Sequence, residues 1–191
     1  AKVFHVAPDQ VTHEMRRQAK AVNFGIVYGI SAFSLSQDIG VTVAEAKAYM
    51  EAYFATFPGV RTYMDAVVAK AKEQGYVEPL FHRRRDLPEL RSSNFNLRSF
   101  GERVALNMPI QGTAADIMKL AMAAVWKRLR QELPEAKLVL QVHDELIVEC
   151  PEPQAEQAAA LLKEEMERVV TLSVPLTADA HWGKNWLEAK G

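Results

Sequence analysis

Apolar residues recur at helical spacing through the first part of the chain, and capping residues mark where individual helices begin and end. Thr12 and Ser31 can each cap a helix start, and Gly40 suits the left-handed position that follows a helix end. Thr42 and Glu45 have the spacing of a capping box. We therefore expect helices over 12–28, 31–40, 46–57 and 60–74.

The rest of the chain mixes helical and strand-like patterns. Pro109 interrupts a long helical pattern and must break or kink it, because proline lacks the amide donor and clashes with the preceding turn. Over 137–150, branched and apolar residues flank a charged centre, which predicts two strands joined by a tight acidic turn. The further expected elements are an extended segment over 76–81, helices over 94–108, 113–133 and 153–170, and a strand over 174–181. The predicted fold class is α+β.

Composition places the chain among globular proteins. It has 191 residues, 49% hydrophobic and 25% charged, enough for one sizeable domain or two modest ones. The formal net charge of -1 gives no overall basic field, so a polyanionic partner must be held by local charge. The single cysteine, Cys150, excludes an internal disulfide and suits a reducing compartment, by default the cytoplasm. No apolar run approaches the roughly 20 residues that span a bilayer, so we expect no membrane partner.

The sharpest candidate for chemistry is the acidic turn at Asp144 and Glu145, which follows His143. Adjacent carboxylates repel each other, and a hairpin turn needs no such pair, so a cation is expected to compensate them. Hard divalent ions such as magnesium take oxygen ligands and typically use only one or two carboxylates. The turn is therefore a candidate magnesium site, and a solvated polar turn is the alternative interpretation.

A second candidate lies on the first helix, where Arg16, Lys20, Phe24 and Tyr28 recur every four residues. These side chains form one stripe roughly 18 Å long, two cations followed by two aromatics. The stripe can hold a nucleoside triphosphate, with the phosphates against the cations and the base and sugar against the aromatics. The alternative is an ordinary amphipathic helix with solvated cations and aromatics in the core.

A third candidate is the row Arg103, Asn107 and Gln111, again at spacings of four. These side chains can donate to minor-groove acceptors, whose pattern is similar for A·T and T·A pairs, so such contacts test shape and not sequence. Pro109 leaves open whether Gln111 shares a face with the other two, and a solvated helix face explains the row as well. The arginine run over 83–85 allows phosphate binding or a solvated loop.

Three segments, taken together, resemble family A DNA polymerases. Residues 15–29 look like the family's motif B, with its arginine, lysine, aromatic and Tyr-Gly at the expected intervals. The segment 141–145, Gln-Val-His-Asp-Glu, is similar to motif C, and 109–116 resembles the segment between the two motifs. The segments occur in the family's order, and the resemblance covers essentially the whole chain.

The resemblance implies a right-hand polymerase fold, with a helical fingers subdomain over 1–88 and part of an antiparallel palm over 89–191. It implies DNA-directed DNA synthesis in replication and repair, in which a deoxynucleoside triphosphate extends a primer 3′-hydroxyl and pyrophosphate leaves. The implied partners are primer-template DNA, deoxynucleoside triphosphates and the remainder of the polymerase chain. Two magnesium ions are the implied cofactors.

The resemblance also implies roles for individual residues. Asp144 would be a ligand of the catalytic magnesium ions, and Glu145 would support the same site. Lys20 would act as general acid on the departing pyrophosphate. The remaining implied contacts are with the nucleotide, through Arg16, Lys20, Phe24 and Tyr28, and with primer and template, through Gly29, Arg103, Asn107, Gln111 and His143.

One part of the family pattern has no counterpart in this sequence. The family pairs the motif C aspartate with a second aspartate from motif A, which precedes motif B, and nothing like motif A occurs before Arg16. We therefore expect that aspartate to lie upstream of Ala1 and the chain by itself not to polymerise DNA. A nucleic-acid-binding module without catalysis is the competing hypothesis, resting on the arginine run and the donor row. An amphipathic-helix interaction protein explains neither the acidic turn nor the cationic stripe.

Overall fold

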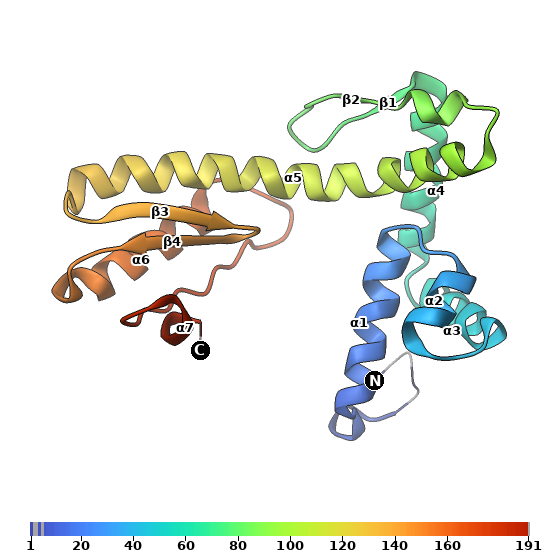
Figure 1. Cartoon of the computed structure of the whole chain (residues 1–191), viewed down its shortest axis with the longest axis horizontal. Helices are drawn as coiled ribbons and strands as arrows, with labels where there is room; N and C mark the ends of the chain where they lie inside the picture. Colours follow the sequence, from blue (N-terminus) through green and yellow to red (C-terminus); the bar gives the residue numbers. More distant parts are fainter. Residues whose placement is uncertain (2–3, 5, 191) are drawn as a thin grey trace. The chain divides into compact units, whose positions relative to one another are not determined.

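The computed structural model describes residues 1, 4 and 6–190 and divides into two compact units, Ala1–Gly112 and Thr113–Gly191 (Figure 1). Helices predominate, and the strands form small antiparallel sheets of two strands each, which confirms the predicted α+β class. The expected division into fingers and palm at residue 88 is a functional boundary and stays a prediction. Across the described residues, none of the helices combines the length and apolar character that a membrane span requires.

The first unit opens with the helices that the capping residues predict. After the short 3₁₀ turn η2 (Pro8–Gln10) come α1 (His13–Val27), α2 (Ala32–Ile39), α3 (Val43–Thr56) and α4 (Pro58–Gln74). Thr12 Oγ1 accepts a hydrogen bond from the Met15 amide at 3.1 Å, and both bonds of the Thr42–Glu45 capping box are present. Gly40 lies in the left-handed region, with φ of 69°. The predicted starts and ends of these helices are therefore confirmed to within a few residues.

A second group of elements in this unit begins after α4. Strand β1 (Tyr76–Val77) pairs antiparallel with β2 (Arg85–Asp86), and η3 (Pro88–Arg91) follows. Only the first of these strands was expected, because the pattern over 76–81 carries no sign that the arginine run returns to pair with it. A core packs beneath the hairpin and the start of the next helix, and its buried members are Ala71, Val77, Leu87, Leu90 and Ala105.

The two helices expected on either side of Pro109 are one helix, α5 (Phe95–Glu132), so the predicted separation is wrong. An internal proline costs a helix about 3 kcal/mol or more. Packing on both sides of the proline opposes that cost. Ala105 is fully buried one turn before it, and Met118 and Val125 belong to the core of the second unit. The low helix propensity of proline predicted a break in the helix, and burial of the residues on both sides of Pro109 outweighs that propensity.

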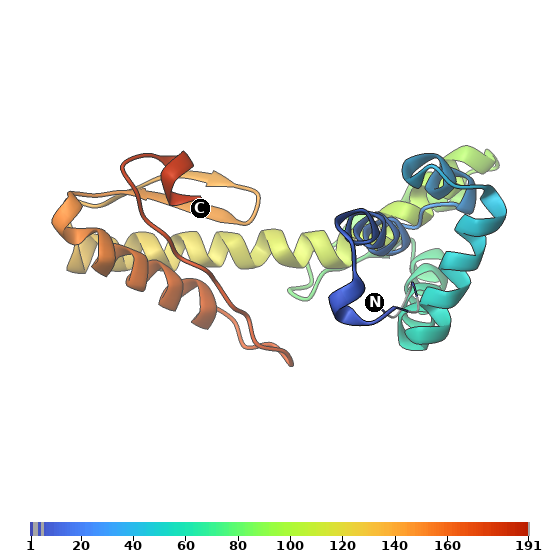
Figure 2. The same ribbon diagram turned by 90° about the horizontal axis from the view of Figure 1, so that it is seen from below.

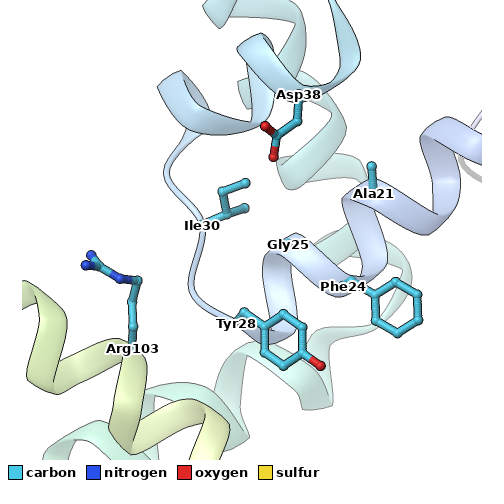
Figure 3. A pocket seen from close by; sticks show the side chains of 7 residues that line it. All are labelled: Ala21, Phe24, Gly25, Tyr28, Ile30, Asp38 and Arg103. Atoms are coloured by element: carbon cyan, nitrogen blue, oxygen red, sulfur yellow. The ribbon is translucent and has the colours of Figure 1, made fainter.

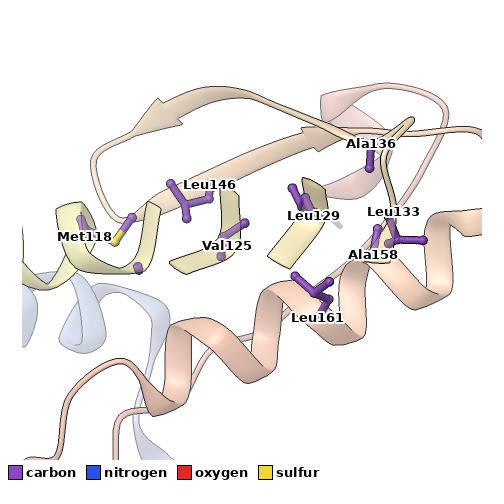
Figure 4. Close-up of a cluster of buried hydrophobic side chains, with 9 residues drawn as sticks. Met118, Val125, Leu129, Leu133, Ala136, Leu146, Ala158 and Leu161 are labelled. Atoms are coloured by element: carbon purple, nitrogen blue, oxygen red, sulfur yellow. The ribbon is translucent and has the colours of Figure 1, made fainter. Parts of the chain in front are cut away.

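The second unit forms around one apolar cluster (Figure 4). It comprises the last part of α5, strands β3 (Lys137–Val142) and β4 (Glu145–Glu149), η4 (Glu152–Gln154), α6 (Ala155–Arg168) and α7 (Trp186–Ala189). Figures 1 and 2 show the hairpin and α6 lying along the C-terminal part of α5. Val125 and Leu129 of α5, Leu146 of β4 and Leu161 of α6 meet in this core. The predicted hairpin and helix are confirmed.

The strand expected over 174–181 is wrong, since these described residues have no regular secondary structure. A strand is defined by a neighbour that satisfies its backbone, and within the described residues β3 and β4 pair only with each other. One amide of the segment is satisfied differently, because the Ala178 N–H donates to the Glu167 carboxylate at 3.0 Å. The apolar pattern predicted an extended strand, but a pattern within one segment does not show which other strand it would pair with.

Candidate nucleotide and nucleic-acid site

Helix α1 has one buried and one exposed face. Val22 and Ile26 are each 1% exposed and contribute to the core formed with α2 and α3. Residues two positions away lie about 200° around the helix, which places Phe24 opposite that core. Phe24 is accordingly 59% exposed, and Arg16 and Lys20 are exposed with it. The alternative interpretation, with the aromatics in the core, is therefore wrong for Phe24.

The two cations of the stripe differ from the neighbouring arginine. Arg17 is engaged by Glu14, with Nε and Nη2 donating to the carboxylate at 2.8 and 2.6 Å. This hydrogen bonding to Arg17 lowers the pKa of Glu14 and keeps the carboxylate charged. Neither Arg16 nor Lys20 forms an ion pair with any carboxylate in the described part of the chain. Their charges are thus available to an external anion.

The aromatic end of the stripe forms one wall of a cavity of about 410 Å³ (Figure 3). The rings of Phe24 and Tyr28 stack with centroids 6.4 Å apart and an interplanar angle of 14°. The other lining residues are Ala21, Gly25, Ile30, Asp38 and Arg103. A flat aromatic surface beside a cavity of this size suits a planar ring of a ligand, because aromatic faces stack on bases regardless of sequence.

The donor row lies on α5, and its three members face the same space. Arg103, Asn107 and Gln111 all line a second cavity of about 380 Å³, together with Tyr28. The helix is continuous through Pro109, so the shared face that the sequence left open is present. Gln111 Nε2 also donates to Tyr28 Oη at 3.2 Å, which connects the row to the aromatic end of the stripe.

Gly29 allows the connection after α1 to approach α5 closely. Its φ of 73° lies in the left-handed region, where a side chain is disfavoured. A Cβ there would lie 2.9 Å from Leu106 Cδ1 and 3.3 Å from Arg103 Cγ. The backbone conformation therefore favours glycine at this position, and a larger residue would also have to displace the Leu106 side chain. The geometry accounts for the glycine without a DNA contact, which stays a prediction.

Sequence reasoning did not name three lining residues of the second cavity, Phe100, Val104 and Met108, and it included a fourth, Arg85, only as a member of the arginine run. The arginine run gave no reason to single out Arg85, whereas the β1–β2 pairing distinguishes it from its neighbour. Arg84 stacks over the Tyr76 ring at 4.0 Å and pairs with Asp86 at 2.7 Å. Successive strand residues point to opposite faces. Arg84 directly precedes β2, so this alternation distinguishes it from Arg85 only once strand β2, which was not predicted, is known.

The acidic turn is a two-residue connection between β3 and β4. His143 has a φ of 52°, and Val142 pairs with Glu145, so Glu145 opens β4 and is not part of the turn. Asp144 is exposed at the tip. Glu145 lies 3.7 Å from the ammonium of Lys190. No group of three possible metal ligands occurs within the described residues. The donor set still fits magnesium, which commonly binds one or two carboxylates and completes its shell with water and substrate phosphates.

The chain matches known proteins along nearly its whole length. Residues 1–188 match the profile of the family described as DNA polymerase family A. Over 188 residues the chain is 56% identical to DNA polymerase I of Geobacillus stearothermophilus, covering 98% of this chain and 22% of that protein. It is 48% identical over 189 residues to the thermostable DNA polymerase I of Thermus thermophilus, covering 99% of this chain and 22% of that protein.

A solved structure agrees with the sequence relatives. It is the POL domain of Pol1 from M. smegmatis in complex with DNA primer-template and dNTP, with a TM-score of 0.95 and 43% identity. The match covers all of this chain and 34% of that one. The chain thus spans about a fifth of the length of the curated relatives it matches. These similarities, together with the helix, donor row and acidic hairpin described above, show that the chain belongs to DNA polymerase family A.

Proposed function

We propose that this chain provides the nucleotide-binding helix, a DNA-contacting row and one metal-binding carboxylate of a DNA-directed DNA polymerase. The observation that carries the proposal is the exposed face of α1. It presents Arg16 and Lys20 without a carboxylate partner in the described structure, followed by the exposed ring of Phe24. Helix stability gives no reason for either charge, because the macrodipole disfavours a cation at Arg16 in the first turn and has little effect at Lys20 in the middle of α1. Binding of an anionic ligand accounts for both.

The stripe suits a deoxynucleoside triphosphate laid along the helix. Arg16 and Lys20 bind the phosphates and stabilise the charge that grows on them during the reaction. Lys20 donates a proton to the departing pyrophosphate, and general acids of this kind contribute about 10²–10⁴-fold to rate. Phe24 packs against the sugar, and Tyr28 lies near the template base. The M. smegmatis relative, solved with dNTP, supports this choice of ligand.

The donor row suits the minor groove of primer-template DNA near the new base pair. Arg103, Asn107 and Gln111 share one face, and their donors test the shape of the pair through acceptors that do not depend strongly on sequence. His143 and Gly29 complete the proposed DNA contacts. In this assignment 1–88 are fingers and 89–191 are part of the palm, with the remainder of the polymerase chain as partner. A cytoplasmic location is consistent with the single cysteine.

Magnesium is the proposed metal, held by Asp144 with support from Glu145. Asp144 would hold such an ion, which would supply Lewis-acid stabilisation of the charge that develops on the reacting oxygens. Asp144 supplies one carboxylate, and the second aspartate is proposed to lie in the remainder of the polymerase. The chain by itself is therefore inactive. Primer extension by the purified chain would contradict this, if an Asp144→Ala chain prepared in parallel shows none and so excludes a contaminating polymerase.

Primer extension by an intact polymerase containing this chain tests the assignment of the stripe. Lys20→Ala is expected to lower single-turnover incorporation by about 10²-fold or more while primer-template affinity changes little. Arg17→Ala is the matched control, since it removes a cation from the same helix but from outside the stripe. A nucleic-acid-binding module without catalysis predicts the opposite, salt-dependent DNA binding that neither Lys20→Ala nor Asp144→Ala alters, with no incorporation to lose.

A further inference from the structure

Lys190, the residue that directly follows the C-terminal helix α7, places a cation beside the acidic hairpin. The Lys190 ammonium lies 3.7 Å from Glu145 Oε1 and 5.6 Å from the centroid of the Trp186 ring. The side chains of Lys190 and Glu145 are 60% and 41% exposed, so water reaches both partners. Lys190 and Trp186 are four residues apart and share a face of the last helical turn. The lysine ammonium thus has both a carboxylate and an aromatic ring as neighbours.

A compact set of contacts fixes the turn that carries Lys190. Asn185 Oδ1 accepts from the Glu188 amide at 3.0 Å, and Asn185 Nδ2 donates to Glu188 Oε1 at 2.7 Å. The Lys184 amide donates to the other oxygen of Glu188 at 3.0 Å. A Cβ at Gly183 would lie 2.6 Å from Glu188 Cβ, so only glycine fits there. Hydrogen bonds and one close backbone contact therefore hold the turn together, and none of the residues of α7 is buried.

This arrangement gives a cationic partner to only one of the two adjacent carboxylates, Glu145 at the start of β4. Asp144 and Glu145 repel each other if both are charged, and Lys190 compensates one of them within the chain. Asp144 remains exposed in the turn. Lys190 therefore supplies part of the positive charge expected at this place, and Asp144 is the carboxylate left without a cationic partner in the described structure.

We propose that Lys190 is a positioning residue, which holds Glu145 by the ion pair and leaves Asp144 as the primary carboxylate ligand for a divalent cation. The inference rests on the proposed metal role of Asp144. The contacts of Glu188 then serve to place Lys190 beside the hairpin, in addition to holding the C-terminal turn together. An exposed ion pair with no effect on the hairpin is the competing account, since many such pairs contribute nothing measurable.

Titration of the chain with Mn²⁺, followed by electron paramagnetic resonance of the free ion, tests the proposal without any enzymatic turnover. Mn²⁺ binds the same oxygen ligands as magnesium. Lys190→Gln removes the charge and frees Glu145 to bind the ion, so the affinity for Mn²⁺ is expected to rise about three- to ten-fold. Lys190→Arg keeps the charge and is expected to restore the original affinity. Lys184→Gln is the matched control, a neighbouring lysine that forms no ion pair in the described structure.

The outcomes separate this inference from the proposed function. A rise with Lys190→Gln, reversal with Lys190→Arg and weakened binding with Asp144→Ala support both. If Asp144→Ala weakens binding but Lys190→Gln matches Lys184→Gln, Lys190 has no positioning role and the metal ligand stands. If Asp144→Ala leaves Mn²⁺ binding unchanged, the proposed metal site is wrong, and the role of Lys190 is overturned with it.

Discussion

Phe24→Ala separates the binding role of the α1 stripe from a structural one. A binding surface predicts a large loss of nucleotide affinity with little loss of stability, whereas a core residue shows the reverse. Phe24 is 59% exposed, so about two fifths of its surface is covered, partly by the stacked ring of Tyr28. Ile26, two positions along the same helix, is 1% exposed and provides the matched core variant.

The magnitudes follow from these exposures. Full burial of a phenylalanine side chain stabilises a protein by about 1.5–3 kcal/mol, and two fifths of that is roughly 1 kcal/mol. Alanine recovers about half of this because it is the better helix former, so the net loss of stability is below about 1 kcal/mol. Ile26→Ala, by contrast, costs about 2–5 kcal/mol. An aromatic surface contributes about 1–3 kcal/mol to a stacked ligand, which corresponds to about 5- to 150-fold in affinity.

Two measurements on the same variants decide the question. Titration with a fluorescent deoxynucleoside triphosphate gives the affinity, and hydrogen exchange of the first-unit amides gives the local free energy of unfolding. The account predicts weakened binding and near-normal protection for Phe24→Ala, and loss of protection for Ile26→Ala. A Phe24→Ala chain that binds nucleotide normally, or one that loses more than about 2 kcal/mol of protection, is incompatible with Phe24 acting as an exposed binding surface.

Two further predictions concern the backbone of the first unit and the charges of the second. Gly29→Ala should destabilise the first unit by about 1–2 kcal/mol for the left-handed backbone alone, with the contacts on α5 adding to it; unchanged hydrogen exchange would contradict this. Hydrogen bonds to Arg128 lower the pKa of Glu132 and of Glu164, so their stabilisation is complete above the ordinary value of 4.5 and is lost as the pH falls through the lowered folded values. All three tryptophans lie in the second unit, so fluorescence-detected urea unfolding at several acid pH values should show this loss, and Arg128→Met should weaken the pH dependence. An acid dependence unchanged by Arg128→Met would assign it to other groups.

Local chemistry made much of this molecule predictable. The capping partners of Thr12 and Thr42 lie three residues away, so the sequence shows both members of each interaction. The α1 stripe is equally local, because a helix brings every fourth residue to one face whatever surrounds it. The acidic hairpin was recognisable for the same reason, with the strands adjacent in sequence.

The features that the sequence did not predict all depend on contacts between residues that are distant along the chain. Continuity of α5 through Pro109 depends on burial on either side, which no short window of sequence contains. Arg85 reaches its cavity only through pairing with β1, and Lys190 reaches Glu145 across 45 residues of chain. The strand expected over 174–181 failed for want of a partner in the described structure. Residue type alone fixes neither a partner nor a register.

The exposed face of α1 is proposed to hold a deoxynucleoside triphosphate. Heteronuclear NMR of the labelled chain during titration with dATP can locate the bound nucleotide, since each residue reports separately. We expect the largest shifts at Arg16, Lys20 and the Phe24 and Tyr28 rings, and inorganic pyrophosphate should reproduce only the shifts at the two cations. Shifts concentrated on the arginine run over 83–85, with α1 unaffected, would contradict this proposal.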